Sequence, residues 1–240
     1  MGIASDLRTL YHVVFKRARG STHQERLESF YRGQAAGYDD FRRRLLHGRE
    51  EMVRSLEVPP GGTLLDLGGG TGSNVEYLGD RLATLKSVTI VDLCPSLLEA
   101  ARQRIERQGW TNVRTALADA TTYEPEDGPV DAVTFSYSLT MIPDWFRALE
   151  RAHALLKPGG VIGVVDFYVS RKHPDAGHVR HPWSTRVFWP LWFNPDNVFP
   201  SPDHVPYLHR RFEVQHFSEH RARVGPLRMP YYLFIGRKPS

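Results

Sequence analysis

A run of glycines follows a short apolar segment and constrains the fold of this chain more than any other feature. Residues 63–67 are the apolar segment, and four of the five residues 68–72 are glycine. Glycine adopts positive φ readily and lets a ligand approach the backbone closely. A helix predicted over residues 73–83 would present unpaired N–H groups and a positive dipole end at this turn. The segment therefore predicts a ligand-binding turn between a strand and a helix.

The spacing of these glycines distinguishes between two cofactor classes. In the dinucleotide fingerprint G-x-G-x-x-G, the third glycine would fall on Ser73 or Val75. The spacing that fits is D-x-G-x-G-x-G, which resembles the first motif of class I methyltransferases. That resemblance implies that the methionine end of S-adenosylmethionine lies over the turn. The cofactor contacts that it implies here are Asp66, Gly68, Gly69, Gly70 and Asn74.

The pattern of apolar segments beyond the turn predicts an α/β fold. Strands are expected at 63–67, 88–91, 113–118, 130–136 and 161–167, with helices at 95–108 and 144–156 between them. Two further strands, 212–218 and 231–236, follow an irregular region. We predict a Rossmann-like, seven-stranded, mostly parallel sheet with one antiparallel strand and helices on both faces. An amino-terminal helical cap is expected over residues 1–60, and the S-adenosylmethionine-binding domain over 61–240, with an aromatic insertion at about 169–207.

Acidic and small residues at the ends of the predicted strands complete the expected cofactor site. Asp92 ends the second strand, where a carboxylate can accept both hydroxyl hydrogens of a ribose. Leu93 can pack on the adenine, and Asp119-Ala120 matches the family position that flanks the same ring. Ser136 ends the fourth strand, beside the first, where ligands bind in open α/β sheets.

Composition excludes several other classes of protein. The single cysteine, Cys94, rules out a disulfide within the chain, and the histidine spacing matches no zinc site, so no metal is expected. The net charge of +4 is only mildly basic and no nucleic-acid motif is visible, so nucleic acid is not an expected partner. No apolar stretch approaches the ~20 residues that span a bilayer. We expect a cytoplasmic protein, either free or peripheral on the inner face of the membrane.

Segments outside the cofactor motifs carry a narrower resemblance. These segments are residues 38–49, 136–143, 188–193, 196–199, 201–204 and 230–238. Together they resemble the diacylglycerylhomoserine N-methyltransferases of betaine-lipid synthesis, the BtaB family. The resemblance implies three methyl transfers onto the homoserine amine of a diacylglycerol-type lipid, after an upstream homoserine-lipid synthase has made that headgroup. The matching tyrosine in related enzymes closes over the methionine moiety, which assigns Tyr38 to the cofactor.

The aromatic segment leaves two interpretations open. Trp183, Trp189 and Trp192 fall within ten residues, with Phe188 and Phe193 among them. Tryptophan favours the membrane interface, and aromatic faces attract quaternary ammonium groups such as the expected product. The same segment can instead pack as a cap over the sheet. The apolar stripe of residues 5–19, with its lysines and arginines, likewise suits either a membrane surface or a cover for the cofactor cleft.

Methyl transfer to an amine requires an uncharged amine and a group that takes its proton. The candidates are Tyr137, Asp166, Tyr168 and His181, from the ends of strands four and five and from the insertion. We expect Tyr137 to touch the amine and Asp166 to lie near it, although core packing would also explain each residue.

Three alternative functions stay open. The first is a methyltransferase with another hydrophobic or small-molecule acceptor, such as a quinone precursor or a phospholipid amine. The second is a cofactor-binding regulatory protein without catalysis, and the third is an NAD-dependent oxidoreductase, which Ser73 and Val75 disfavour.

Overall fold

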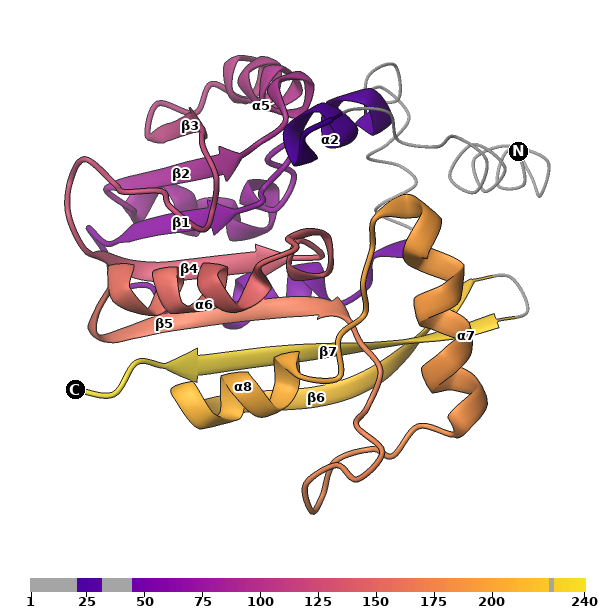
Figure 1. The fold of residues 1–240 in the computed structure, drawn as a ribbon. Coiled ribbons are helices and arrows are strands. Elements are labelled where there is room, and N and C mark those ends of the chain that lie inside the picture. Colours follow the sequence, from indigo (N-terminus) through magenta and orange to yellow (C-terminus); the bar gives the residue numbers. More distant parts are fainter. Residues whose placement is uncertain (1–20, 32–44, 225–226) are drawn as a thin grey trace.

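The computed structural model describes residues 21–31, 45–224 and 227–240 of the chain. Figure 1 draws the fold in colours that follow the sequence. Two features expected from the sequence lie outside the described residues: Tyr38 and the apolar stripe of residues 5–19.

The fold is built on a seven-stranded sheet with the strand order β3-β2-β1-β4-β5-β7-β6. The strands are β1 (Thr63–Leu67), β2 (Ser87–Asp92), β3 (Val113–Leu117), β4 (Val130–Ser136), β5 (Leu156–Phe167), β6 (Glu213–Val224) and β7 (Leu227–Arg237). The strands β1 to β5 pair in parallel, and β7 runs antiparallel between β5 and β6. The predicted mixed sheet is confirmed. In Figure 1 the parallel strands point toward one edge of the sheet, where α7 crosses.

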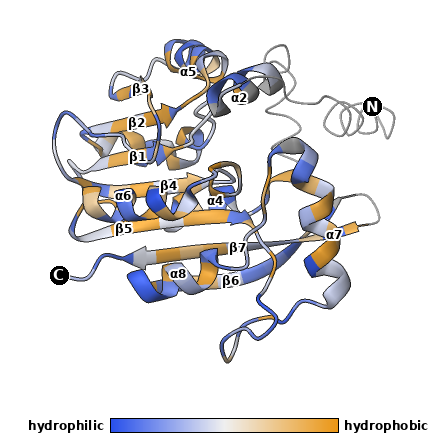
Figure 2. Ribbon diagram, viewed as in Figure 1, coloured by the Kyte–Doolittle hydropathy of each residue, from blue (hydrophilic) through white to orange (hydrophobic). Residues whose placement is uncertain are grey.

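Helices pack on both faces of this sheet. They are α2 (His23–Tyr31), α4 (Arg49–Ser55), η1 (Val75–Thr84), α5 (Pro95–Gln108), η2 (Leu139–Met141), α6 (Trp145–Leu155), α7 (Trp183–Phe193), η3 (Asn194–Asp196) and α8 (His204–Arg211). One face carries α4, η1 and α5, whose apolar side chains join a single buried cluster. The other face carries α6 and α8, which contribute to a second cluster. The strands between them are apolar along much of their length, as Figure 2 shows.

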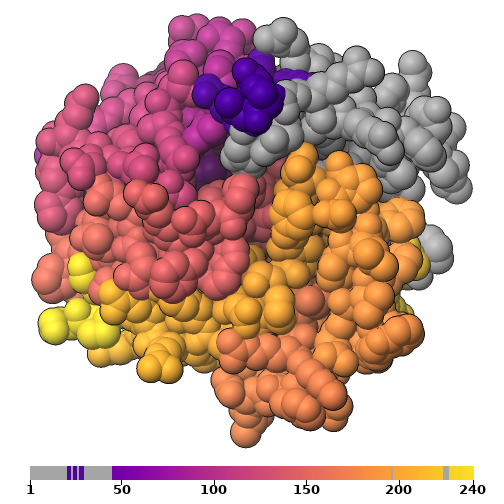
Figure 3. All heavy atoms as spheres, in the orientation of Figure 1, coloured from indigo at the N-terminus to yellow at the C-terminus, as the bar shows by residue number. Residues whose placement is uncertain are grey.

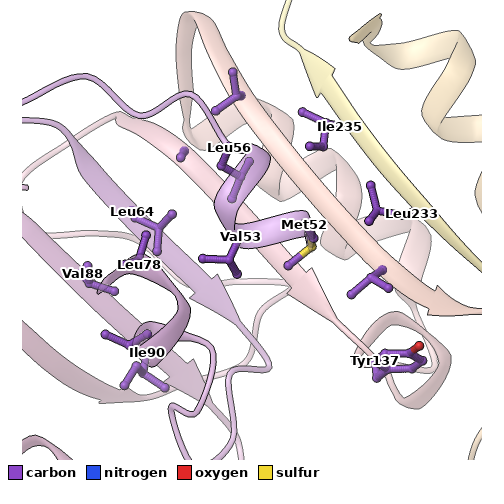
Figure 4. Close-up of a cluster of buried hydrophobic side chains, with 14 of the residues drawn as sticks. Met52, Val53, Leu56, Leu64, Leu78, Val88, Ile90, Tyr137, Leu233 and Ile235 are labelled. Carbon is purple, nitrogen blue, oxygen red and sulfur yellow. The ribbon is translucent and has the colours of Figure 1, made fainter. Parts of the chain in front are cut away.

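The short helix α4 contributes to the core although it precedes the sheet. Met52 and Leu56 are 0% and 1% exposed, and both lie within 3.1 Å of the position where Gly163 would carry a Cβ. Figure 4 shows Met52, Val53 and Leu56 facing β-strand side chains such as Leu64 and Leu233. Burial of each such side chain stabilises the fold by roughly 1.5–3 kcal/mol. Part of the expected cap therefore packs as core, and the domain boundary at residue 60 stays a prediction.

The structure corrects three local predictions. The element after the glycine turn is a 3-10 helix, and it is kinked at Gly79, where φ is 54° and ψ is −136°. The fifth strand, expected at 161–167, begins at Leu156 in β5, beside an irregular register with β4. The insertion, expected to be irregular, contains α7 and α8, and Pro190 lies inside α7. Aromatic burial at the sheet edge stabilises α7 despite this proline, which local propensity could not predict.

The described residues bear on two classes of function, membrane insertion and metal binding. In the described part of the chain, no helix combines the length and apolar character that crossing a bilayer requires. Among the same residues, no group of three or more His, Cys, Asp or Glu side chains is arranged to hold a metal ion.

Candidate functional site

The glycine turn has a regular backbone pattern that explains its spacing. Gly68, Gly70 and Gly72 have φ values of 70°, 57° and 70°, so every second residue is left-handed. The N–H groups of Gly68 and Gly69 both donate to the carbonyl of Val91, at 2.8 and 3.1 Å. Residues with a Cβ adopt this conformation at a cost of about 1–2 kcal/mol each. The D-x-G-x-G-x-G spacing therefore reflects an alternating backbone that is tied to β2.

Close packing gives two of these glycines a second reason to lack a side chain. A Cβ on Gly68 would lie 2.5 Å from Cβ of Ser138. A Cβ on Gly69 would lie 2.8 Å from Oδ2 of Asp66, and Gly69 is not among the residues that line the cleft described below. The turn thus approaches both its own strand and the segment after β4 as closely as backbone allows.

Asp92 is oriented by backbone hydrogen bonds at the end of β2. Gly70 N–H donates to its Oδ2 and Cys94 N–H to its Oδ1, both at 2.8 Å. Its side chain forms part of the cleft wall although the residue is only 9% exposed. A carboxylate held in this way is preorganised to receive the hydroxyls of a sugar.

A cleft of about 260 Å³ lies at the carboxyl ends of β1, β2 and β4. Its lining consists of Leu27, Gly68, Gly70, Val91, Asp92, Leu93, Leu97, Ala118, Asp119, Ala120, Thr121, Tyr137, Ser138, Met141, Ile142, Pro143 and Asp144. Three of these residues are aspartates, and none of the described lining residues is lysine or arginine. The cleft combines apolar walls with negative charge, which suits a cationic ligand that carries a flat apolar ring.

The structure brings seven of the predicted site residues together in this cleft. They are Gly68, Gly70, Asp92, Leu93, Asp119, Ala120 and Tyr137. Asp119 is exposed, and its Oδ1 accepts from the N–H of Thr121 at 2.8 Å, which holds the loop after β3. These positions agree with a ligand that extends from the glycine turn past Asp92 to the loop after β3.

Asp66 and Asn74, two predicted cofactor contacts, lie behind the turn and not in the cleft. Asp66 is 1% exposed and accepts from Asn74 Nδ2 at 3.0 Å and from Thr134 Oγ1 at 2.8 Å. Asn74 Oδ1 in turn accepts from Arg49 of α4, at 2.7 Å from Nη2. This buried network links α4, β1, the turn and β4. In this structure both residues support the shape of the turn.

Ser136 also lies outside the cleft, and Ser138 takes its place in the lining. Ser136 is 1% exposed, and its hydroxyl makes no hydrogen bond among the described residues. Ser138 lines the cleft and donates from Oγ to the carbonyl of Leu67 at 2.9 Å. Ser138 reaches the lining because the chain continues toward the ligand edge after β4 ends, and the cofactor contact expected at Ser136 stays a prediction.

Tyr137 lies in the cleft wall with an unusual backbone. Its φ is 54°, which is uncommon for a residue with a side chain. The hydroxyl donates to the carbonyl of His47 at 2.7 Å, and the ring packs 4.5 Å from that of Phe167. Burial, with a further contribution from the negative charge of Asp166, raises the pKa of Tyr137 well above its usual value. The phenol therefore stays protonated. Tyr137 can offer a ligand in the cleft its aromatic ring but not a phenolate.

The structure does not bring Asp166 or His181 to the cleft. Asp166 is buried on β5 and accepts from Thr140, at 3.1 Å from the N–H and 2.8 Å from Oγ1. Burial raises its pKa to about 7. His181 accepts at Nδ1 from the N–H of Ser170 at 3.0 Å, and burial lowers its pKa to about 4. Asp166 anchors the segment that lines the cleft, whereas His181 closes the loop after β5.

Sequence reasoning missed part of the cleft wall. Met141, Ile142 and Pro143 come from the segment after β4, which carried the resemblance but was assigned no role. Leu27 of α2 and Leu97 of α5 reach the cleft from distant parts of the chain. The position of Met141, Ile142 and Pro143 just after a strand end could have identified them from the sequence. Leu27 reaches the cleft only through the packing of α2, which the sequence does not indicate.

A row of aromatic rings connects the cleft to the surface of α7. From Tyr137 it passes to Phe167 at 4.5 Å, to Phe193 at 5.6 Å, to Trp189 at 5.6 Å and to Phe188 at 5.0 Å between ring centroids. Of these rings, Trp189 is buried and Phe188, the last, is exposed on α7, which Figure 3 shows in orange. We call these five rings the aromatic row.

Helix α7 carries both buried and exposed apolar side chains. Trp189 is 4% exposed and belongs to the core, as a cap over the sheet would. Trp183 and Leu191 are 71% and 69% exposed, and Val187, Phe188 and Trp192 are also exposed. We call these five exposed side chains the outer face of α7.

Known proteins match the part of the chain that carries the glycine turn and most of the cleft. Residues 64–160 match the family model described as a methyltransferase domain. A ubiquinone/menaquinone biosynthesis C-methyltransferase from Hydrogenovibrio crunogenus is 32% identical over 120 residues, which are 50% of this chain and 47% of that protein. A trans-aconitate 2-methyltransferase from Variovorax paradoxus is 31% identical over 53% of this chain and 46% of that protein. The chain thus spans about half the length of these curated relatives.

Solved structures share the fold at low sequence identity. A phosphoethanolamine N-methyltransferase of Haemonchus contortus, solved with phosphomonomethylethanolamine and S-adenosylhomocysteine, superposes with a TM-score of 0.67 at 16% identity. The match covers 92% of this chain and 61% of that one. The predicted class I fold is therefore confirmed.

Proposed function

From the premise that residues 64–160 form an S-adenosylmethionine-dependent methyltransferase domain, we propose that this chain methylates the amine of a lipid headgroup. The single observation that carries the proposal is the aromatic row, which joins the cofactor cleft to the exposed outer face of α7. A soluble acceptor would not need the exposed apolar side chains of this outer face.

The cleft fits S-adenosylmethionine on several independent points. Gly68 and Gly70 offer backbone without side chains, where the methionine end would lie. Asp92 would hold the ribose hydroxyls, and Leu93 and Ala120 would flank the adenine, with Asp119 near its exocyclic amine. The acidic lining suits a ligand whose sulfonium and ammonium groups are positive, and opposes the pyrophosphate of a dinucleotide.

When bound, the cofactor supplies a methyl group made electrophilic by the positive sulfur. The chain must bring an uncharged amine to it and exclude water. The exposed carboxylate of Asp144 at the cleft can take the proton that the amine loses. The ring of Tyr137 can contact the amine and, once methyl groups accumulate, stabilise its fixed positive charge through the aromatic face. Asp166 acts on this site by positioning Thr140, next to the lining residue Met141.

We further propose that the acceptor is diacylglycerylhomoserine and that three transfers give the trimethylated betaine lipid. The resemblance of residues 188–193 and 230–238 to the enzymes of betaine-lipid synthesis supports this acceptor. An upstream homoserine-lipid synthase would supply it. The protein would then work as a peripheral protein on the inner face of the membrane.

The outer face of α7 supports membrane contact. Trp183, Val187 and Leu191 follow one another at four-residue spacing, so they share one side of the helix. Arg186 is the only charged residue of α7, and Arg180 precedes the helix. Tryptophan with flanking arginine is typical of surfaces that lie in the headgroup region of an anionic bilayer.

The acceptor is tested by incubating the purified chain and S-adenosylmethionine with vesicles of each candidate lipid. Mass spectrometry should find mono-, di- and trimethylated products from diacylglycerylhomoserine, and none from phosphatidylethanolamine. Methylated products from phosphatidylethanolamine alone would overturn the homoserine headgroup as the acceptor. The proposal that the acceptor is an aminolipid would still stand. Cells that also express a homoserine-lipid synthase provide the same test with natural acyl chains.

Membrane contact is tested by vesicle co-sedimentation with a variant of the outer face. Leu191→Ser should weaken binding to anionic vesicles about tenfold or more, because a leucine contributes about 1.5–3 kcal/mol when it leaves water. Val214→Ser is the matched control, since Val214 is 42% exposed at the opposite end of the sheet. Equal binding by both variants and the wild type would contradict a role for α7.

A second candidate is C-methylation of a quinone precursor. The relative from Hydrogenovibrio crunogenus carries that activity in its name, and the exposed apolar face of α7 would also suit a prenylated quinol. Including a demethylated menaquinol in the vesicle assay separates the two, because a product there without any aminolipid product would favour the quinone.

A further inference from the structure

The carboxylate of Glu28 links helix α2 to the start of α5, beside the cofactor cleft. Glu28 Oε2 accepts from the N–H of Ser96 at 3.2 Å and from Sγ of Cys94 at 3.1 Å. These two groups form the amino terminus of α5, whose own N-cap residue, Cys94, provides no side-chain cap. Glu28 therefore caps α5 from another helix, 66 residues away in sequence. A carboxylate at a helix amino terminus is also favoured by the helix dipole.

The same helix forms part of the cleft wall. Leu27 lines the cleft and packs with Leu97 and Met141 in a small apolar cluster around Cys94. Figures 1 and 3 show α2 (indigo) beside α5 at the upper edge of the molecule. The helix begins with a capping box, in which Glu25 N–H donates to Thr22 Oγ1 at 3.1 Å and Thr22 N–H to Glu25 at 3.2 Å.

We infer that Glu28 is a positioning residue that docks α2 as a wall of the cofactor cleft, so that docking of α2 and binding of the cofactor strengthen each other. This inference rests on the proposed function for the identity of the ligand. The attachment site lies two residues after Asp92, and Cys94 N–H also donates to Asp92. The ribose-binding carboxylate and the docked helix therefore share one short segment of backbone.

Cys94 provides an internal measure of docking. It is the only cysteine of the chain, and it is 0% exposed with its thiol facing Glu28. Burial, with a contribution from Glu28, raises the pKa of this thiol to about 12, so the docked protein holds almost no thiolate at neutral pH. Because the thiolate is the reactive form, a thiol reagent should modify Cys94 mainly when α2 is undocked.

The experiment compares thiol modification in the wild type, Glu28→Ala, Glu28→Gln and Glu99→Gln, each with and without S-adenosylhomocysteine. Glu99→Gln is the matched control, because Glu99 is an exposed acid on α5 that pairs with Arg102. Loss of a cap typically changes a helix equilibrium about fivefold. We expect Glu28→Ala to react at least about fivefold faster, Glu28→Gln to lie between, and Glu99→Gln to match the wild type. Circular dichroism confirms that each variant is folded.

Linkage adds a quantitative requirement. If docking and binding are coupled, undocking of α2 weakens the affinity of the protein for S-adenosylhomocysteine by some factor, which calorimetry measures. Bound S-adenosylhomocysteine must then slow modification of Cys94 in the wild type by the same factor. If Glu28→Ala proves unstable, Leu27→Ser undocks α2 by removing an apolar contact instead. It should likewise speed modification of Cys94 and weaken the affinity for S-adenosylhomocysteine. Equal modification rates in folded Glu28→Ala and wild type would overturn the inference. Failure of the wild type to bind S-adenosylhomocysteine would instead overturn the proposed function and leave the docking result standing.

Discussion

The N–H of Gly70 donates a 2.8 Å hydrogen bond to Oδ2 of Asp92, and this bond ties the glycine turn after β1 to the end of β2. One carboxylate thus holds the shape of the turn and forms the wall of the adjacent cleft. The two motifs that the sequence presents 22 residues apart are therefore a single structural unit. Damage to either should affect cofactor binding.

Replacement of Asp92 by alanine should weaken S-adenosylhomocysteine binding at least tenfold, or about 1.4 kcal/mol. The variant loses the expected acceptor of the ribose hydroxyls and also the bond that orients Gly70. Calorimetry measures the affinity directly. Asp127→Ala removes the same charge from an exposed ion pair and should leave the affinity unchanged. An Asp92→Ala affinity equal to that of the wild type would refute the ribose assignment.

Replacement of Gly68 by alanine should abolish cofactor binding through geometry and not through charge. The new Cβ would lie 2.5 Å from Cβ of Ser138, in a backbone with φ of 70°. Gly109→Ala serves as the control, because Gly109 has φ of 66° but no atom within 4 Å of its added Cβ. Both variants carry a conformational cost of about 1–2 kcal/mol, seen in thermal unfolding. Only Gly68→Ala should lose binding; the same affinity in both would contradict the close approach.

Replacement of Trp189 by alanine should destabilise the fold by about 3–5 kcal/mol, because the ring is 4% exposed within the core. Trp192→Ala, at 37% exposure, should cost clearly less. Denaturant unfolding of the two variants makes the comparison. Similar small losses in both would mean that the aromatic row is not anchored at Trp189.

Asp166 should make stability depend on pH. Burial raises its pKa from 3.8 to about 7, so the folded state takes up a proton that the unfolded state releases. Its contribution is fully present below the unfolded pKa and is lost as pH rises toward about 7, by at most ~1.4 kcal/mol per pH unit. The Asp166→Asn variant should lack this loss.

The measurement is the free energy of unfolding of the wild type and Asp166→Asn at about pH 5 and about pH 8. Raising the pH should lower the free energy of unfolding of the wild type relative to that of Asp166→Asn. If the wild type instead becomes more stable relative to the variant at the higher pH, Asp166 is ionised in the folded protein and Thr140 is held by a charged carboxylate.

Local patterns predicted the sheet, and seven of the predicted site residues line the cleft. The glycines after β1, Asp92 after β2 and Asp119 after β3 follow strand ends, and parallel strand ends meet at one edge of the sheet. Prediction failed where a residue near a strand end turns inward. Asp66, Ser136 and Asp166 are each 0–1% exposed, and no local pattern distinguishes such a residue from one that reaches the ligand.

The amino-acid order alone determined the alternating glycines, the strand–helix alternation and the cofactor class, because these depend on backbone freedom and on short-range periodicity. Only the folded chain decided that Ser138 replaces Ser136 at the cleft, that Leu27 forms a wall, and that aromatic rings of β5 and α7 connect Tyr137 to the surface. Each of these depends on contacts between segments that are distant in sequence, and their energies exceed the local preferences that a sequence pattern records.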